Sequence, residues 1–124
     1  MPFECPQCHA PTLKIDLALE LPASDDDDEV QVQVVKCGAC AFEALAVYRE
    51  NRRGALDRES WRHDGYEAGG EALGSIRRAI ESCPARSERS CGCASHVALA
   101  KYNWAAVAGN GIEVVREFEM RMVR

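Results

Sequence analysis

The stretch EVQVQVVKCGAC, residues 29–40, decides the fold. Its first seven residues place valines on one face and glutamines on the other, which is the period-two pattern of a β-strand. The strand continues directly into Cys37-Gly-Ala-Cys40, a turn whose two sulfurs can converge on one metal ion. A strand that ends in such a turn predicts a small antiparallel sheet held at one end by a metal.

The partners of this stretch lie upstream. Cys5-Pro-Gln-Cys8 is a second C-x-x-C turn, and 28 residues separate it from Cys37. Residues 12–21 alternate as well, and leucine or isoleucine at every second position from 13 to 21 would share one face of a strand. Residues 22–28, PASDDDD, predict a solvated loop between the strands; a calcium site is less favoured there because no EF-hand spacing is present.

The two turns resemble the knuckles of the zinc-ribbon family, in which CPxC and CGxC flank an antiparallel sheet. The resemblance covers residues 3–50. It implies that Cys5, Cys8, Cys37 and Cys40 bind one zinc ion through four thiolates. The alternative is a redox dithiol, but a thioredoxin-like fold requires a βαβ unit that this sequence does not provide.

Composition favours metal binding over disulfides. The chain has 124 residues with 6% aromatic residues, so its core is modest. No run of about 18 apolar residues predicts a membrane span, and the N-terminus lacks the pattern of a signal peptide, so we expect a cytoplasmic protein. In that reducing compartment, seven cysteines are better explained as metal ligands. Seven cysteines and one histidine would complete two tetrahedral sites.

The second candidate site is the segment CPARSERSCGCASH, residues 83–96. Cys83, Cys91, Cys93 and His96 have the residue types of a Cys₃His zinc site, and Gly92 would let the backbone bend between two of the thiolates. Two alternatives remain open. The thiols can be small buried side chains beside a core histidine, or Cys91 or Cys93 can be a nucleophile with His96 as its base. A full set of four protein ligands would indicate structural rather than catalytic zinc.

The remaining segments predict a mixture of elements. Residues 41–50 fit either a strand or a helix, and we prefer a strand because a knuckle precedes them. Residues 51–66 look irregular. Residues 70–82 and 94–102 predict helices, the first with Leu73, Ile76 and Ile80 on one face. Residues 112–123 predict a C-terminal strand that extends the ribbon sheet, with one apolar face that Arg116 interrupts.

Charge is unevenly distributed along the chain. Residues 1–48 carry a net charge of −7 and residues 49–124 a net charge of +2, which sum to −5. The acidic half disfavours contact with nucleic acid. The arginines that could contact an anion or a nucleic acid are Arg49, Arg52, Arg53, Arg58 and Arg62. A solvated surface is the simpler interpretation of these residues. His63 and Asp64 could form an acid–base pair, but a polar pair in a loop, without function, is the simpler interpretation.

The sequence therefore predicts an α+β protein. Residues 1–50 would form a zinc ribbon, and residues 51–124 a helical segment with the second cysteine cluster and the C-terminal strand, sharing one core with the ribbon. The expected function is a non-enzymatic protein with two structural zinc ions that binds a protein partner. One alternative is a nucleic-acid-associated ribbon of the transcription or translation machinery. Another is a thiol redox enzyme or a metalloenzyme.

Overall fold

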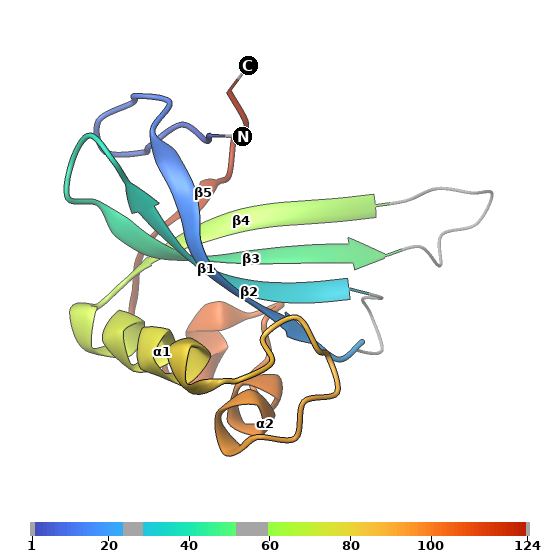
Figure 1. Ribbon diagram of the computed structural model, residues 1–124. Coiled ribbons are helices and arrows are strands. Elements are labelled where there is room, and N and C mark those ends of the chain that lie inside the picture. Colours follow the sequence, from blue (N-terminus) through green and yellow to red (C-terminus); the bar gives the residue numbers. More distant parts are fainter. Residues whose placement is uncertain (1, 24–28, 52–59, 124) are drawn as a thin grey trace.

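The chain folds around a five-stranded antiparallel sheet (Figure 1). The computed structural model describes residues 2–23, 29–51 and 60–123 of the chain. The strands are neighbours in chain order: β1 (Leu13–Leu21), β2 (Glu29–Cys37), β3 (Glu43–Asn51), β4 (Ser60–Ala68) and β5 (Val114–Glu119). Helices α1 (Gly70–Ser82) and α2 (Ala94–Ala100) lie on one face of the sheet with the short 3₁₀ turn η1 (Val107–Asn110). The α+β prediction is thus confirmed.

Most predicted elements are present at the expected places. The choice of a strand after the second knuckle is confirmed by β3, and both predicted helices form. The prediction of irregular structure up to residue 66 is wrong for residues 60–66, which belong to β4; residues 52–59 lie outside the described part. The C-terminal strand pairs with β4 and is shorter than predicted. Among the described helices, none is long and apolar enough to cross a membrane.

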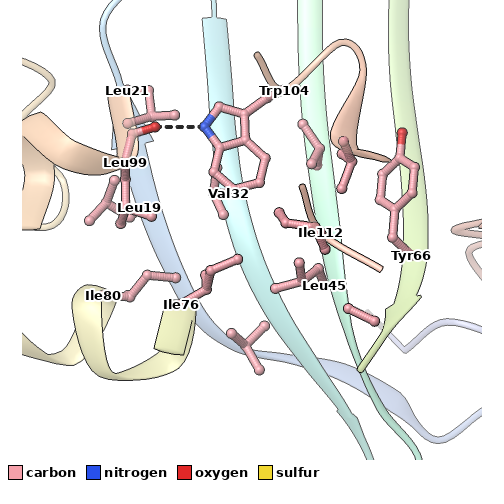
Figure 2. Packing of buried hydrophobic residues seen from close by; sticks show 14 of the residues in the cluster. Leu19, Leu21, Val32, Leu45, Tyr66, Ile76, Ile80, Leu99, Trp104 and Ile112 are labelled. Atoms are coloured by element: carbon pink, nitrogen blue, oxygen red, sulfur yellow. Dashed lines mark hydrogen bonds between the residues drawn. The ribbon is translucent and has the colours of Figure 1, made fainter. Parts of the chain in front are cut away.

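The larger core fills the space between the sheet and the helices. Leu73, Ile76 and Ile80 of α1 are buried there, as their spacing predicts. Figure 2 shows Trp104 above Val32, with its indole N–H donating to the carbonyl oxygen of Leu99 at 2.8 Å. This bond satisfies the only polar group of a buried tryptophan. The core therefore fastens the segment after α2 to the sheet.

The opposite face of the sheet holds a second core, because residues 2–4 close the sheet at one end. Phe3 pairs with Leu13 on one side and with Met122 on the other. It thereby joins the first strand to the segment that follows the last. The enclosed apolar residues are Phe3, Cys5, Leu13, Val35, Cys37, Phe42, Ala44, Ala46 and Met120. The N-terminal cysteine turn consequently sits at the end of a buried core.

Two register shifts explain why single apolar faces do not run the length of β1 and β5. In β1 the register shifts between Ile15 and Leu17. Leu13 therefore joins the second core, Leu19 joins the helix-side core, and Ile15 is 41% exposed. The prediction that these alternate residues share one face is wrong for that reason, since one extra residue reverses the alternation.

The shift at the other edge lies between Glu67 and Ala68, where β4 pairs with β5. It leaves Val114 packed against the helix-side core, whereas Phe118 packs against the second core. Arg116, which interrupts the predicted apolar face, forms an ion pair with Glu67 at 2.8 Å. Its guanidinium also lies 5.5 Å from the centre of a phenylalanine ring.

Candidate metal centres

The first candidate centre brings the two C-x-x-C turns together at the closed end of the sheet. The Sγ atoms of Cys5, Cys8, Cys37 and Cys40 all lie within 4.8 Å of one another. Cys5 and Cys40 are 3.7 Å apart at sulfur, and so are Cys8 and Cys37. Four sulfurs placed 2.3 Å from a central zinc would be about 3.8 Å apart, whereas a disulfide requires about 2.05 Å. The four thiols therefore fit a tetrahedral metal and are unbonded.

Local hydrogen bonds shape the second turn around one sulfur. The backbone N–H groups of Ala39 and Cys40 both point at Sγ of Cys37, at 3.3 and 3.4 Å. The hydroxyl of Thr12 lies 3.0 Å from the same sulfur. The N–H of Gly38 donates to the carbonyl oxygen of Thr12 at 2.9 Å, which ties this turn to the start of β1. The turn is thus preorganised to stabilise a thiolate.

The first turn closes through an unusual backbone conformation. His9 has a φ of 63°, in the left-handed region that glycine adopts most readily. Its N–H donates to the carbonyl oxygen of Cys5 at 2.9 Å, so the conformation completes the turn. His9 thus contributes to the turn through its backbone.

The thiols of this centre differ in acidity. The Thr12 hydroxyl, assisted by the two backbone N–H groups, lowers the pKa of Cys37 to about 6. The N–H of Phe42 would lower the pKa of Cys40, but burial and the neighbouring sulfurs raise it to about 12. Burial also raises the pKa of Cys5. The protein therefore stabilises the Cys37 thiolate, whereas the thiolates of Cys5 and Cys40 would be stabilised by a nearby cation such as zinc.

The second candidate centre lies between the end of α1 and the start of α2. The ligand atoms of Cys83, Cys91 and His96 lie within 4.8 Å of one another. The sulfurs of the two cysteines are 3.7 Å apart, and Sγ of Cys83 is 3.3 Å from Nδ1 of His96. Tetrahedral zinc would place such a sulfur and nitrogen about 3.6 Å apart. These three residues therefore fit a shared metal ion.

Cys93 is the predicted fourth ligand of this centre. Its sulfur lies more than 4.8 Å from at least one of the ligand atoms of Cys83, Cys91 and His96. Instead it caps α2 by accepting a hydrogen bond from the backbone N–H of His96 at 3.3 Å. This bond lowers the pKa of Cys93, whereas burial raises the pKa of Cys83 to about 11. Cys91 and Cys93 are both partly buried and pack against the helix-side core, to which Cys83 belongs.

His96 shows what distinguishes this cluster from buried thiols alone. The residue is 1% exposed, and its Nε2 atom has no hydrogen-bond partner among the described residues. A buried imidazole whose only partner is one thiol is poorly satisfied as a core side chain. The nitrogen that faces the thiols is Nδ1, which is the atom able to ligate a metal there. This nitrogen is in hydrogen-bonding contact with Cys83, and not with Cys91 or Cys93, which are the residues predicted as possible nucleophiles.

The predicted arginine cluster is described only in part. Arg52, Arg53 and Arg58 lie outside the described residues. Arg49 and Arg62 are directly opposite each other in β3 and β4. Arg62 also forms an ion pair with Asp64 at 3.3 Å. The structure thus brings two of the five arginines together.

A partly buried chain of polar side chains connects strands β1, β2 and β4, and it was not evident in the sequence. Gln33 is 2% exposed, and its side-chain oxygen is 2.7 Å from Nε2 of His63. Its amide nitrogen donates to Gln31, which in turn donates to Glu20 at 2.6 Å. Burial lowers the pKa of His63, although the nearby Asp64 opposes this shift. The valine–glutamine alternation shows only which face these glutamines occupy, because their burial depends on closure of the sheet.

Comparisons with known proteins do not extend these assignments. No family model, curated protein sequence or solved structure matches the chain. The function is therefore inferred from the two cysteine clusters themselves.

Proposed function

We propose that this protein is a non-enzymatic adaptor that binds two structural zinc ions and presents its sheet to a protein partner. The observation that carries the proposal is the convergence of six cysteines and one histidine into two clusters with separations suited to tetrahedral zinc. The first centre would be a zinc-ribbon site with four thiolates. The second would be completed by a small movement of Cys93.

Position in the fold supports a structural role for both ions. Cys5 and Cys37 are 0% and 2% exposed and belong to the second core. Cys83 belongs to the helix-side core. A zinc ion at each cluster would therefore cross-link chain segments that already pack together, which adds stability where the aromatic content is low. Four protein ligands would leave no open position for a substrate.

Native mass spectrometry on the purified protein tests this proposal directly. We expect two zinc ions per wild-type chain. A Cys5→Ser, Cys40→Ser variant should retain one ion, and a Cys91→Ser, His96→Ala variant should also retain one. His9→Ala is the matched control, because it changes a residue of the first turn that is not a ligand, and it should retain two ions.

The assignment of each centre can fail separately. Either double variant, if it still binds two ions, would refute the site that it alters. A wild-type protein that binds none, when purified under reducing conditions with zinc supplied, would refute the whole proposal. The role of Cys93 is tested by Cys93→Ser, which should weaken zinc binding at the second centre only.

A further inference from the structure

The outer edge of β5 is one of the two edges of the sheet. Among the described residues, no strand pairs with this edge along Val114–Glu119. Just beyond it, the chain already accepts an antiparallel segment. The N–H of Glu4 donates to the carbonyl oxygen of Arg121 at 2.9 Å, and the N–H of Val123 donates to that of Pro2 at 3.0 Å. The same edge can therefore pair over its remaining length.

The backbone groups available on this edge belong to Glu117 and Glu119. The N–H of Met120 donates inward to the carbonyl oxygen of His63 at 2.9 Å. Because inward and outward backbone groups alternate along an antiparallel strand, the groups of Glu117 and Glu119 point outward. Their side chains lie on the same face, opposite Tyr66 and Asp64 of β4. An added strand would thus place alternate side chains beside these two carboxylates.

The charges on β5 disfavour a second copy of this chain as the partner. Symmetric antiparallel pairing centred on Arg116 would set that residue opposite its own copy. Centring on Glu117 would set two copies of Glu117 opposite each other, and centring on Phe118 would set Glu117 opposite Glu119. Each register places like charges in direct contact, which is destabilising.

A basic strand would meet no such repulsion. Both glutamates are exposed. Among the described residues, Glu119 forms a 3.8 Å ion pair with Arg121, in which both side chains are about 70% exposed. Such exposed pairs contribute little and are readily exchanged. Lysine or arginine opposite each carboxylate would replace repulsion with attraction.

A cavity of about 240 Å³ adjoins this strand on the same face. Its lining residues are Tyr66, Ala105, Ala106, Val107, Ala108, Gly109, Val114 and Glu117. The walls are mainly small apolar side chains, with one carboxylate and one phenol. Burial raises the pKa of Tyr66, and the charges of Asp64 and Glu117 add to this effect. An apolar wall with a carboxylate suits the aliphatic stem and cationic head of lysine.

We propose that the β5 edge binds an extended basic segment of a partner protein as a sixth strand, with lysine or arginine side chains opposite Glu117 and Glu119. Main-chain hydrogen bonds would provide affinity, and the two carboxylates with the adjoining cavity would provide selectivity. This proposal rests on the adaptor function proposed above. If the glutamates only protect the edge from aggregation, no such segment will bind.

The test uses the full-length, zinc-loaded protein and the blocked peptide SVKVKVS, with amide hydrogen exchange as the readout. We expect the peptide to slow exchange at Glu117 and Glu119. The peptide SVEVEVS should not do so, and neither should SVKVKVS carrying N-methyl groups on its pairing edge. Glu117→Lys with Glu119→Lys should lower the affinity for SVKVKVS by about tenfold or more and should create binding of SVEVEVS.

The control is Glu71→Lys with Glu81→Lys, which makes the same charge change on two exposed residues of α1 and should leave peptide affinity unchanged. Absence of protection along β5, or equal binding by both double variants, would overturn the proposal. Zinc content measured on the same sample separates the two proposals. Two bound ions without peptide binding refute the edge alone. Protection of β5 with no bound zinc refutes the metal centres alone.

Discussion

Replacing Gly65 with alanine should destabilise the protein through one cross-strand contact. Gly65 of β4 is directly opposite Phe118 of β5, and the phenylalanine ring lies over the glycine. A Cβ atom built on Gly65 would be 2.2 to 2.7 Å from three ring atoms. Carbon atoms do not approach so closely, so the ring would have to leave its place against Phe42, whose ring centre is 5.7 Å away.

The magnitude follows from two opposing effects. Overpacking of this kind costs roughly 1–3 kcal/mol. Alanine in a strand is favoured over glycine by about 0.5–1 kcal/mol because it restricts the unfolded chain. We therefore expect Gly65→Ala to lower the free energy of unfolding by about 1–2 kcal/mol. In a Phe118→Ala background the clash is absent, so the same change should raise the free energy of unfolding by about 0.5 kcal/mol.

The four proteins to compare are the wild type, Gly65→Ala, Phe118→Ala and the double variant. Urea unfolding of each zinc-loaded protein, followed by tryptophan fluorescence, measures its free energy of unfolding. The matched control is Gly70→Ala at the start of α1, where a Cβ would meet nothing within 4 Å. That change should be neutral or stabilising. If Gly65→Ala has the same effect with and without Phe118, the steric argument is refuted.

Three further predictions concern the metal turns and the arginines. Thr12→Val removes the hydroxyl that helps to hold the pKa of Cys37 near 6, so the pH at which half of the first zinc is released, measured by titration with a zinc indicator, should move upward. His9→Gly relieves a φ of 63° and should raise the free energy of unfolding of the zinc-loaded protein by about 1 kcal/mol in the same urea assay; no change would show that the turn is unstrained. Arg49→Glu with Arg62→Glu should abolish any binding of a labelled RNA or DNA oligonucleotide at low salt if the nucleic-acid alternative holds. Absence of binding by the wild type would remove that alternative.

The two cysteine clusters could be predicted from the sequence because cysteine spacing is a local property. Two C-x-x-C turns and the strand between Glu29 and Cys37 suffice to place the first set of ligands together. The convergence of Cys83, Cys91 and His96 follows similarly from a short loop between two helices. In both cases the residues that matter are few and their chemistry is distinctive.

The strand β4 could not be predicted because its alternation is largely polar. His63 occupies a half-buried position, and its partner is Gln33 on β2, not an apolar side chain. Whether such a residue is buried depends on closure of the sheet by Phe3, 60 residues earlier in the chain. The register shift beside Ile15 could not be predicted either, because the pairing of strands in the folded protein determines where a bulge forms. The alternation of leucines in β1 continues through the bulge and gives no sign of it.

The bridge from Phe3 to Leu13 and Met122 has a consequence for the order of folding. Neighbouring strands of the sheet are joined by short connections, except between β4 and β5, so most of its pairing is local in sequence. The Phe3–Met122 contact instead closes almost the entire chain, and closing long loops is slow and entropically costly. A zinc ion that joins Cys5 to Cys40 would fix Phe3 beside the nascent sheet before the C-terminal segment arrives. We therefore expect the first metal to bind early in folding and the two chain ends to meet last.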